Sequence, residues 1–189
     1  MKRRVSESMA VKAAMLSDES FWERAGRASD LMVEALSGGH RVMFCGNGGS
    51  AADAQHLAAE LSGRFYYDRP PLNSEALHCN TSFLTAVAND YSYDEVYARM
   101  LRASATRGDV LVGISTSGNS RNILAAFAVA RELGVHTVAF TGKSGGAMAA
   151  ACDICLNVPS SDTPRVQEAH ILLGHILCER VEARLFPRS

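Results

Sequence analysis

The chain has 189 residues, of which 47% are hydrophobic and 21% charged, and its formal net charge is −1. This length and apolar share are typical of one domain with a full core. The near-neutral charge gives no general attraction for nucleic acid or anionic membranes, so we expect neither as a partner. The N-terminal residues lack the apolar run of a signal peptide, and no segment has the roughly 18 unbroken apolar residues of a membrane span. We therefore expect a cytoplasmic protein.

Helical and strand-like patterns alternate along the chain. Residues 5–38 have apolar side chains at three- and four-residue spacing, which predicts a helical region before the first strand. A less regular strand and helix fit residues 74–90. The other predicted strands are short apolar runs at 41–45, 109–115, 135–140 and 153–158. The predicted helices that accompany them lie at 50–62, 94–105, 119–133, 144–150 and 164–186.

This alternation predicts an α/β fold with a parallel sheet that helices cover on both faces. The strands are apolar throughout, as a sheet buried on both sides requires. We expect a single domain over residues 1–189, with an α/β core at 41–186. The N-terminal helices at 1–38 have no place in a βαβ unit. We expect them to pack on the outside or against a second copy of the chain.

Three predicted strands are followed by loops of similar composition. These loops are GNGGS after 41–45, STSGNS after 109–114 and TGKSGG after 135–140. In a doubly wound sheet all three lie at the ligand-binding edge. Glycines allow close approach of the backbone, and hydroxyls and free N–H groups at helix N-termini bind anions. The same residues also make ordinary turns and helix caps, but three such loops favour a phosphorylated ligand.

The loops do not fit the nucleotide-binding motifs. GNGGSA at 46–51 matches G-x-G-x-x-A, but the region where an acidic residue should follow a second strand is SGRFYYDRPP. TGKS resembles the end of a P-loop, but Thr137 stands where the first glycine is needed. A small phosphorylated molecule, most simply a sugar phosphate, remains.

Histidine, glutamate and cysteine residues outside these loops are also candidates for chemistry. His56 and Glu60 are four residues apart and share one helix face; taken alone, such a pair is commonly a surface contact. His175 lies in the apolar run ILLGHILC, so it is either a neutral core residue or a site residue. Cys152 and Cys155 form a C-x-x-C in a strand-like run, and we expect them to be structural.

The chain resembles the sugar isomerase (SIS) domain family, and within it the bacterial phosphoheptose isomerases. The resemblance covers about residues 41–186, through CGNGGSAADAQHLAAELSGRF, ANDYSYDEVYARM, GDVLVGISTSGNSRNILAAF, FTGKSGG and RVQEAHILLGH. It implies a flavodoxin-like three-layer sandwich, N-terminal helices used in oligomer packing, a homotetramer and one zinc ion per subunit. The implied reaction converts D-sedoheptulose 7-phosphate to D-glycero-D-manno-heptose 7-phosphate. This is the first step of bacterial ADP- or GDP-heptose synthesis, which supplies lipopolysaccharide.

The resemblance also implies roles for individual residues. The family's catalytic residues fall on Glu60 and His175. Its metal ligands fall on His56, Glu60, Gln167 and His175. Its substrate-binding residues fall on Asn47, Gly48, Gly49, Arg64, Asn89, Asp90, Ser115, Thr116, Ser117, Ser120 and Gln167. Some members have an acidic residue where this chain has Pro164, and Asp162 or Thr163 is the candidate replacement.

Aldose–ketose isomerisation needs a base, an acid and stabilisation of developing negative charge, and Glu60 and His175 could supply the first two. Two alternatives remain: a non-catalytic adaptor that binds the replication initiator, as one family member does, and a sugar-phosphate sensor. The presence of both Glu60 and His175 favours an enzyme over both.

Gln167 and His175 are eight residues apart, about 12 Å along a helix axis. Either Gln167 precedes the helix or the two ligands come from different copies of the chain. We therefore expect the site to lie at a subunit interface.

Overall fold

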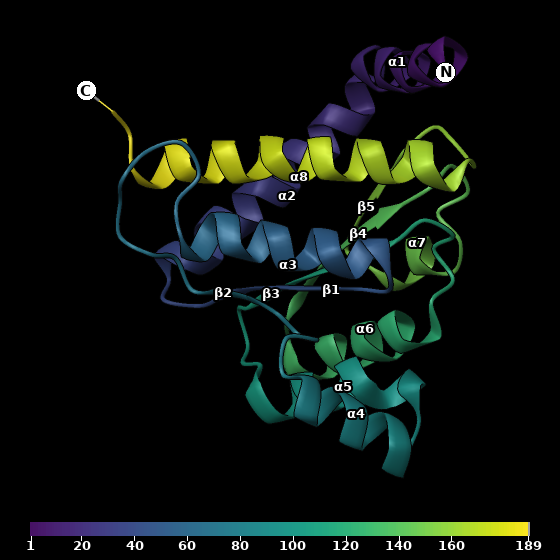
Figure 1. Cartoon of the computed structure of the whole chain (residues 1–189). Coiled ribbons are helices and arrows are strands. Elements are labelled where there is room, and N and C mark those ends of the chain that lie inside the picture. The colour runs from purple at the N-terminus through teal and green to yellow at the C-terminus, as the bar shows by residue number, and fades with distance from the viewer. Residues whose placement is uncertain (189) are drawn as a thin grey trace.

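The computed structural model describes residues 1–188, which form a five-stranded sheet between two helical layers (Figure 1). All neighbouring strands are parallel, and Val42 of the first strand pairs with Val110 of the third. The spatial order β2-β1-β3-β4-β5 is that of a flavodoxin-like fold, so the predicted fold class is confirmed. The strands are β1 (Val42–Gly46), β2 (Ser74–Ala76), β3 (Val110–Ser115), β4 (His136–Thr141) and β5 (Ile154–Asn157).

The helices divide between the two faces of this sheet. The helices are α1 (Lys2–Leu16), α2 (Glu19–Ser37), α3 (Gly49–Ser62), α4 (Thr81–Asp90), α5 (Val96–Ser104), α6 (Arg121–Leu133), α7 (Met148–Ala151) and α8 (Thr163–Leu185). One apolar layer is formed with α2, α3 and α8, and the other with α4 to α7 (Figure 1). Within residues 1–188, none of these helices combines the length and apolarity that a bilayer crossing would need.

Two predicted helical segments differ from the structure. The region 5–38 is interrupted at Ser17 and Asp18, because Asp18 caps the start of α2 and its carboxylate accepts a hydrogen bond from the Phe21 N–H at 3.0 Å. The predicted helix at 144–150 is reduced to α7, because Gly145 and Gly146 adopt φ values of 72° and 56°. Positive φ is incompatible with a right-handed helix. The other predicted elements lie within two residues of the observed ones.

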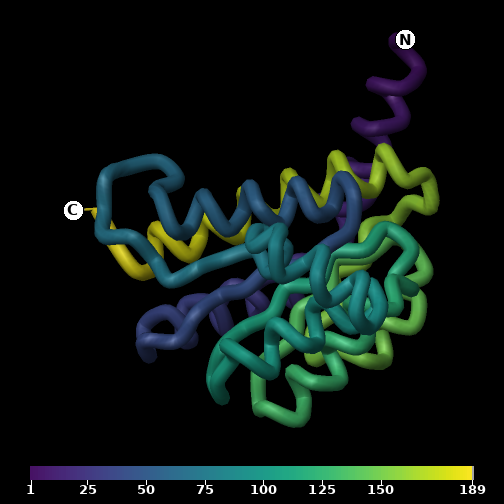
Figure 2. The backbone as a smooth tube through the Cα atoms, turned by 60° about the horizontal axis from the view of Figure 1, so that its bottom comes forward, coloured from purple at the N-terminus to yellow at the C-terminus, as the bar shows by residue number. Residues whose placement is uncertain are grey.

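The N-terminal helices occupy different environments. Phe21, Ala28 and Met32 of α2 are buried in the same apolar layer as α3 and α8, so α2 packs on the sheet of its own chain. Helix α2 is thus part of one helical layer over the sheet. Helix α1 projects from the body and leaves Val5 and Met9 exposed (Figure 2). Its use in oligomer packing stays a prediction.

Helices α3 and α8 run side by side in the same direction (Figures 1 and 2). Near the start of both helices, the Gln167 side chain lies against Gly49. Two turns further, Gly174 faces Leu57, and a Cβ at Gly174 would lie 2.4 Å from Leu57 Cδ1. Leu57 is buried among core residues, so it has little room to move. The missing side chain of Gly174 therefore allows the two helices to approach this closely.

We predict that Gly174→Ala lowers the free energy of unfolding by about 1–3 kcal/mol, because the new methyl group overpacks the contact between α3 and α8. Gly26→Ala is the matched control: it lies inside α2, and a Cβ there meets nothing within 4 Å. Helix propensity alone should make this control neutral or more stable by up to about 1 kcal/mol. Chemical denaturation of both variants checks the prediction, and equal effects would contradict it.

His170 of α8 is buried beneath the end of β4. Its Nε2 lies 3.1 Å from the Thr141 carbonyl oxygen, so Nε2 carries the proton and donates. Burial lowers the pKa of His170 to about 4, and the bond to Thr141 only partly opposes this. The imidazole is therefore neutral at pH 7, and His170 is a structural histidine of the core.

We predict a specific loss of stability on acidification. Below pH 6.5 the unfolded chain protonates His170 but the folded chain does not until about pH 4, so the folded state is penalised as pH falls through this window. The penalty at pH 5 is about 2 kcal/mol. His170→Gln keeps a donor and removes the titration. Its stability loss between pH 7 and pH 5, measured by denaturant titration, should be smaller than that of the unsubstituted protein; an equal loss would contradict the assignment.

Candidate functional site

Three predicted site residues meet on the outer surface of the α3–α8 pair. His56 and Glu60 lie one turn apart on α3, and His175 lies on α8. The Nε2 atoms of His56 and His175 are 2.7 Å apart, and His56 Nε2 is 3.2 Å from Glu60 Oε1. The Glu60 side chain is 22% exposed and that of His56 is 46% exposed, so the cluster is open to small molecules. Residues 119 positions apart in the sequence thus form one group of two imidazoles and one carboxylate.

This trio fits a metal ion. One ligand atom from each residue lies within 4.8 Å of the other two. Two imidazole nitrogens and a carboxylate oxygen are donors that zinc takes at about 2 Å. In addition, the two Nε2 atoms face each other at 2.7 Å, so one cation between the rings could accept a lone pair from each. The residues therefore fit zinc as the resemblance implied, with room for further ligands on the exposed side.

Gln167 does not join this group in the same chain. It lies inside α8 rather than before it, and its side chain contacts Gly49 at the start of α3. His175 is eight residues further along the same helix, about 12 Å away along the axis. Of the two arrangements that the sequence left open, an early position for Gln167 is therefore wrong. A Gln167 from another copy of the chain stays a prediction.

Two residues that lie around the trio, Phe65 and Asp53, were not predicted from the sequence. The Phe65 ring packs near His175, with ring centroids 5.7 Å apart. Asp53 lies on α3, one turn before His56, and its buried Oδ2 has no hydrogen-bond partner within residues 1–188. Burial raises the pKa of Asp53, while His56 and His175 partly offset the rise. The i, i+3, i+7 spacing of Asp53, His56 and Glu60 could have placed the aspartate on this face.

The loops after β1 and β3 form a second candidate region. After β1 the chain adds β2 on one side of it, and it then crosses back to add β3, β4 and β5 on the other side. The point between β1 and β3, where the strand order reverses, is where such sheets bind ligands. Paired amides join Asn47, in the loop after β1, to Asn122, in the first turn of α6: Asn47 Nδ2 donates to Asn122 Oδ1 at 3.0 Å and Asn122 Nδ2 donates to Asn47 Oδ1 at 2.8 Å. The Tyr93 hydroxyl also donates to Asn47 at 3.1 Å. Asn122 and Tyr93 were not predicted, because only the fold brings them to Asn47.

Hydroxyl groups gather at the end of β3. The Ser115 Oγ lies 2.8 Å from Ser120 Oγ and 3.4 Å from Ser117 Oγ. Ser120 is the N-cap of α6, and Gly48 is the N-cap of α3, so the first turns of two long helices begin here. Free N–H groups and the positive helix ends make this region suitable for an anion.

The other predicted residues lie around these two regions. Gly49 begins α3, and Thr116 follows β3, where its carbonyl accepts the Gly142 N–H at 3.0 Å. Asn89 and Asp90 end α4, with Asn89 Nδ2 donating to Asp90 Oδ1 at 2.9 Å. No hydrogen bond in the described chain joins either of them to the serine hydroxyls or to the trio. Arg64 is exposed in the loop after α3, directly before Phe65.

The structure shows where Pro164 and its neighbour Asp162, the candidate replacement for the acidic residue of some relatives, lie. Pro164 stands in the first turn of α8, where a missing N–H is tolerated. Asp162 is the N-cap residue of this helix, and its carboxylate lies 3.9 Å from the Arg4 guanidinium. Asp162 therefore faces α1 of its own chain, and a role for it in place of the acidic residue of some relatives stays a prediction.

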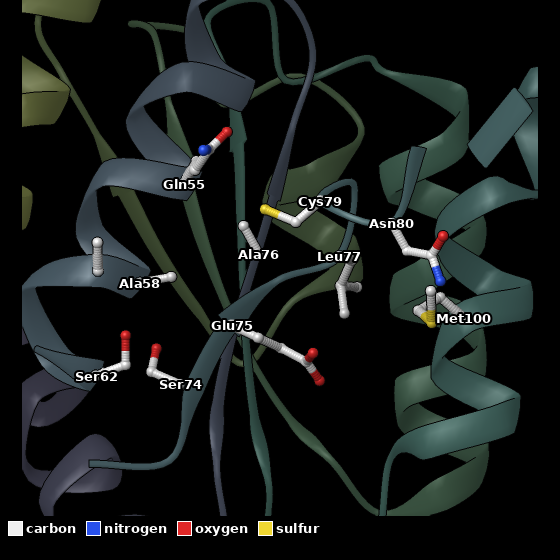
Figure 3. Close-up of a pocket in the computed structure, with 11 residues that line it drawn as sticks. Gln55, Ala58, Ser62, Ser74, Glu75, Ala76, Leu77, Cys79, Asn80 and Met100 are labelled. Carbon is white, nitrogen blue, oxygen red and sulfur yellow. The ribbon is translucent and has the colours of Figure 1, made fainter. Parts of the chain in front are cut away.

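A separate hollow lies at the β2 edge of the sheet. Its volume is about 270 Å3, with α3 on one side, β2 as its floor, and Asn80 and Met100 on the other side (Figure 3). Gln55 and Ala58 line it, on a face of α3 adjacent to that of His56 and Glu60. None of the predicted site residues lines this hollow, so it does not serve as the candidate site.

The C-x-x-C cysteines belong to the apolar layer around α6. Cys152 follows α7, Cys155 lies on β5, and both are half-buried against that layer. A hydrogen bond from Cys152, together with Thr141 and Arg24, lowers the pKa of Cys155 to about 6 despite burial, and the pKa of Cys152 rises in return. Both thiols are free in the structure. Their packing fits the expected structural role.

Comparisons with known proteins show the family of this chain. Residues 10–142 match the SIS domain family. The chain is 56% identical over 184 residues to a phosphoheptose isomerase from Mycobacterium tuberculosis, covering 97% of this chain and 94% of the relative. It is 47% identical to a phosphoheptose isomerase from Aneurinibacillus thermoaerophilus, over 98% of this chain and 94% of the relative.

A solved structure gives the same result. The fold matches phosphoheptose isomerase GmhA from Neisseria gonorrhoeae with a TM-score of 0.90 and 43% identity, covering 96% of each chain. The match extends over the sheet and both helical layers, since so little of either chain is left out. The chain therefore belongs to the SIS domain family and, within it, to the phosphoheptose isomerases.

Proposed function

We propose that this chain is a ketose–aldose isomerase that converts D-sedoheptulose 7-phosphate to D-glycero-D-manno-heptose 7-phosphate. The observation that carries the proposal is the convergence of His56, Glu60 and His175 within one ion-sized space. The relatives' name supports the class of reaction and the phosphorylated seven-carbon sugar. In a bacterium this reaction would be the first step of ADP- or GDP-heptose synthesis for lipopolysaccharide, carried out in the cytoplasm by a single domain that spans residues 1–189.

In this proposal the sugar phosphate group binds where the loops after β1 and β3 meet. Ser115, Thr116, Ser117 and Ser120 donate hydroxyl or backbone hydrogen bonds to it, and the N-terminus of α6 adds a favourable dipole. Asn47, Gly48 and Gly49 hold the sugar from the β1 side, with Asn89, Asp90, Arg64 and Gln167 as further substrate contacts. The amide pair between Asn47 and Asn122 supports this role because it fixes the loop after β1 relative to the start of α6.

Glu60 and His175 divide the proton transfers. Glu60 removes a proton from C1 of the ketose while His175 donates a proton to the C2 carbonyl oxygen, which gives the enediol. Glu60 then delivers the proton it carries to C2, while the neutral His175 takes the O1 proton as the carbonyl forms at C1, so both groups return to their starting protonation states. The proximity of a carboxylate and an imidazole that are both partly exposed supports this division, since each can reach a substrate that binds over the α3–α8 pair.

We propose one zinc ion per subunit, held by His56, Glu60 and His175 with Gln167 as the fourth ligand. When bound, zinc would act as a Lewis acid on the substrate oxygens that become negative in the enediol. His56 would then serve as a ligand alone, whereas Glu60 and His175 would transfer protons only while they are not coordinated, since a metal-bound carboxylate or imidazole nitrogen is not free to do so.

We further propose that each site combines residues of two subunits of a homotetramer. Two separations within the chain support this. Gln167 and His175 are about 12 Å apart along α8, and Gly49 and Glu60 are about 16 Å apart along α3. A seven-carbon sugar phosphate spans roughly 10 Å at about 1.5 Å per bond, so one chain's phosphate loops and its own Glu60 are far apart for one substrate.

The alternatives are a non-catalytic adaptor for the replication initiator and a sugar-phosphate sensor. Both would use the same fold and loops, and fold alone does not distinguish them. Neither needs an acid and a base beside each other, so the trio favours the isomerase.

We predict that Glu60→Gln and His175→Gln each lower kcat for sedoheptulose 7-phosphate by roughly 100-fold or more, because each removes one proton-transfer group. NMR detection of the aldose product measures the rate, after treatment with a chelator and again after added zinc. Glu179→Gln and His136→Gln, both at exposed positions, are the matched controls and should keep full activity. Saturable sugar-phosphate binding without turnover by the unsubstituted protein would identify a sensor or adaptor instead.

The shared site predicts complementation between two inactive variants. Glu60→Gln and Gln167→Ala should each be inactive alone. When the two are coexpressed and assembled at random, about a quarter of the sites should receive both intact residues from different chains. Recovery of activity near that level supports a site at the interface, whereas no recovery would mean that each chain builds its site alone.

A further inference from the structure

A buried ion pair lies near the C-terminal ends of α3 and α8. Arg69, in the loop after α3, donates from Nε to Glu182 Oε1 at 3.0 Å, and the side chains of both residues are only 1% exposed. Figure 2 shows this loop arching from the end of α3 over the end of α8. The pair therefore joins the two helices that carry the candidate trio.

Glu182 fixes the start of this loop from α8. Its carboxylate accepts hydrogen bonds from the Phe65 N–H at 2.9 Å and the Tyr66 N–H at 2.8 Å, besides the bond from Arg69. Burial alone would raise the pKa of Glu182, but these two N–H groups and the Arg69 guanidinium bring it below its usual value. The carboxylate is therefore ionised and occupied on both oxygens.

Arg69 fixes the end of α3. Its Nη2 donates to the Glu60 carbonyl oxygen at 2.9 Å, and its Nη1 donates to the Leu61 carbonyl oxygen at 2.8 Å and to that of Gly63 at 3.0 Å. The last carbonyls of a helix have no partner within the helix, and a cation there is also favoured by the helix dipole. Arg69 thus binds the backbone of the proposed base itself.

The same network reaches the proposed acid by two routes. Glu182 is seven residues after His175 on α8, two turns along the same face. Phe65, whose backbone Glu182 holds, packs its ring near that of His175 with centroids 5.7 Å apart. One ion pair therefore contacts the backbone of Glu60 and the aromatic neighbour of His175.

We propose that Arg69 and Glu182 are positioning residues that hold Glu60 and His175 at their working separation; this inference rests on the proposed function. A buried ion pair is by itself weak evidence for a contribution to stability. This ion pair differs in its partners, because all three guanidinium nitrogens donate hydrogen bonds, to the Glu182 carboxylate or to the carbonyl oxygens at the end of α3. Lysine has a single ammonium and cannot reproduce that arrangement.

The test compares Arg69→Lys and Glu182→Gln in the full-length protein with two kinds of control. Arg102→Lys changes an exposed ion pair, with Glu132 at 2.8 Å, that lies in the opposite helical layer. Phe127→Leu destabilises the buried core beneath α6 without touching α3 or α8. The measurements are the thermal midpoint, kcat and KM for sedoheptulose 7-phosphate, and the affinity for zinc alone by competition with a chromophoric chelator.

We expect Arg69→Lys to lower kcat by roughly tenfold or more while KM changes by less than about threefold, since a shift of about 1 Å in catalytic groups can cost 100-fold. Zinc affinity should fall roughly tenfold or more, as it does when groups that orient metal ligands are removed. Arg102→Lys should change neither quantity, and Phe127→Leu should lower only the thermal midpoint. In Glu182→Gln the side-chain NH2 group replaces one carboxylate oxygen, so one of the buried N–H donors that Glu182 binds faces another donor. This variant should show the same losses of kcat and zinc affinity as Arg69→Lys, or fail to fold.

The proposal would be overturned if Arg69→Lys lost as much thermal stability as Phe127→Leu but kept its kcat and zinc affinity. The ion pair would then have only a structural role. If the unsubstituted protein binds zinc but does not turn over sedoheptulose 7-phosphate, the proposed reaction fails. In that case the zinc affinity of Arg69→Lys still decides whether the pair positions the trio.

Discussion

The close parallel contact between α3 and α8 is the feature on which the candidate trio depends. The two helices approach where Gly174 faces Leu57, and His175 is the next residue along α8. With a larger residue at 174, the imidazoles of His56 and His175 could not remain 2.7 Å apart without displacement elsewhere. Sheet, loops and the remaining helices hold these two helices in place, and the candidate trio lies on the surface that they share.

The architecture separates the candidate phosphate-binding loops from the candidate trio. The loops after β1 and β3 lie at the point where the strand order reverses, a position common to ligand sites in this kind of sheet. The trio lies instead part-way along two helices. Such a division would allow one fold to keep its ligand-binding edge in proteins with different activities, because the groups on the helices can change without disturbing the loops.

Much of this organisation follows from the sequence through local rules. Apolar runs predicted the strands because a sheet covered on both faces excludes polar side chains, and His56 and Glu60 could be paired from helical spacing alone. The break at Asp18 and the shortening at Gly145 and Gly146 were missed because capping and positive φ act on single residues inside otherwise helical patterns. The partners of Asn47, and the approach of His175 to His56, depend on contacts over 46 to 119 positions, which no local pattern encodes.

The chain order has a consequence for how the protein is made. His175 and Glu182 lie on the last helix, whereas His56, Glu60 and Arg69 lie in the first half of the chain. During synthesis the sheet and its early helices can form while the final segment is still within the ribosome. The surface of α3 that will receive α8 is then exposed, with Leu57 uncovered and the Arg69 guanidinium lacking its carboxylate. Every nascent chain thus passes through a stage in which this apolar surface is uncovered, and the candidate trio is completed only once α8 has packed against α3.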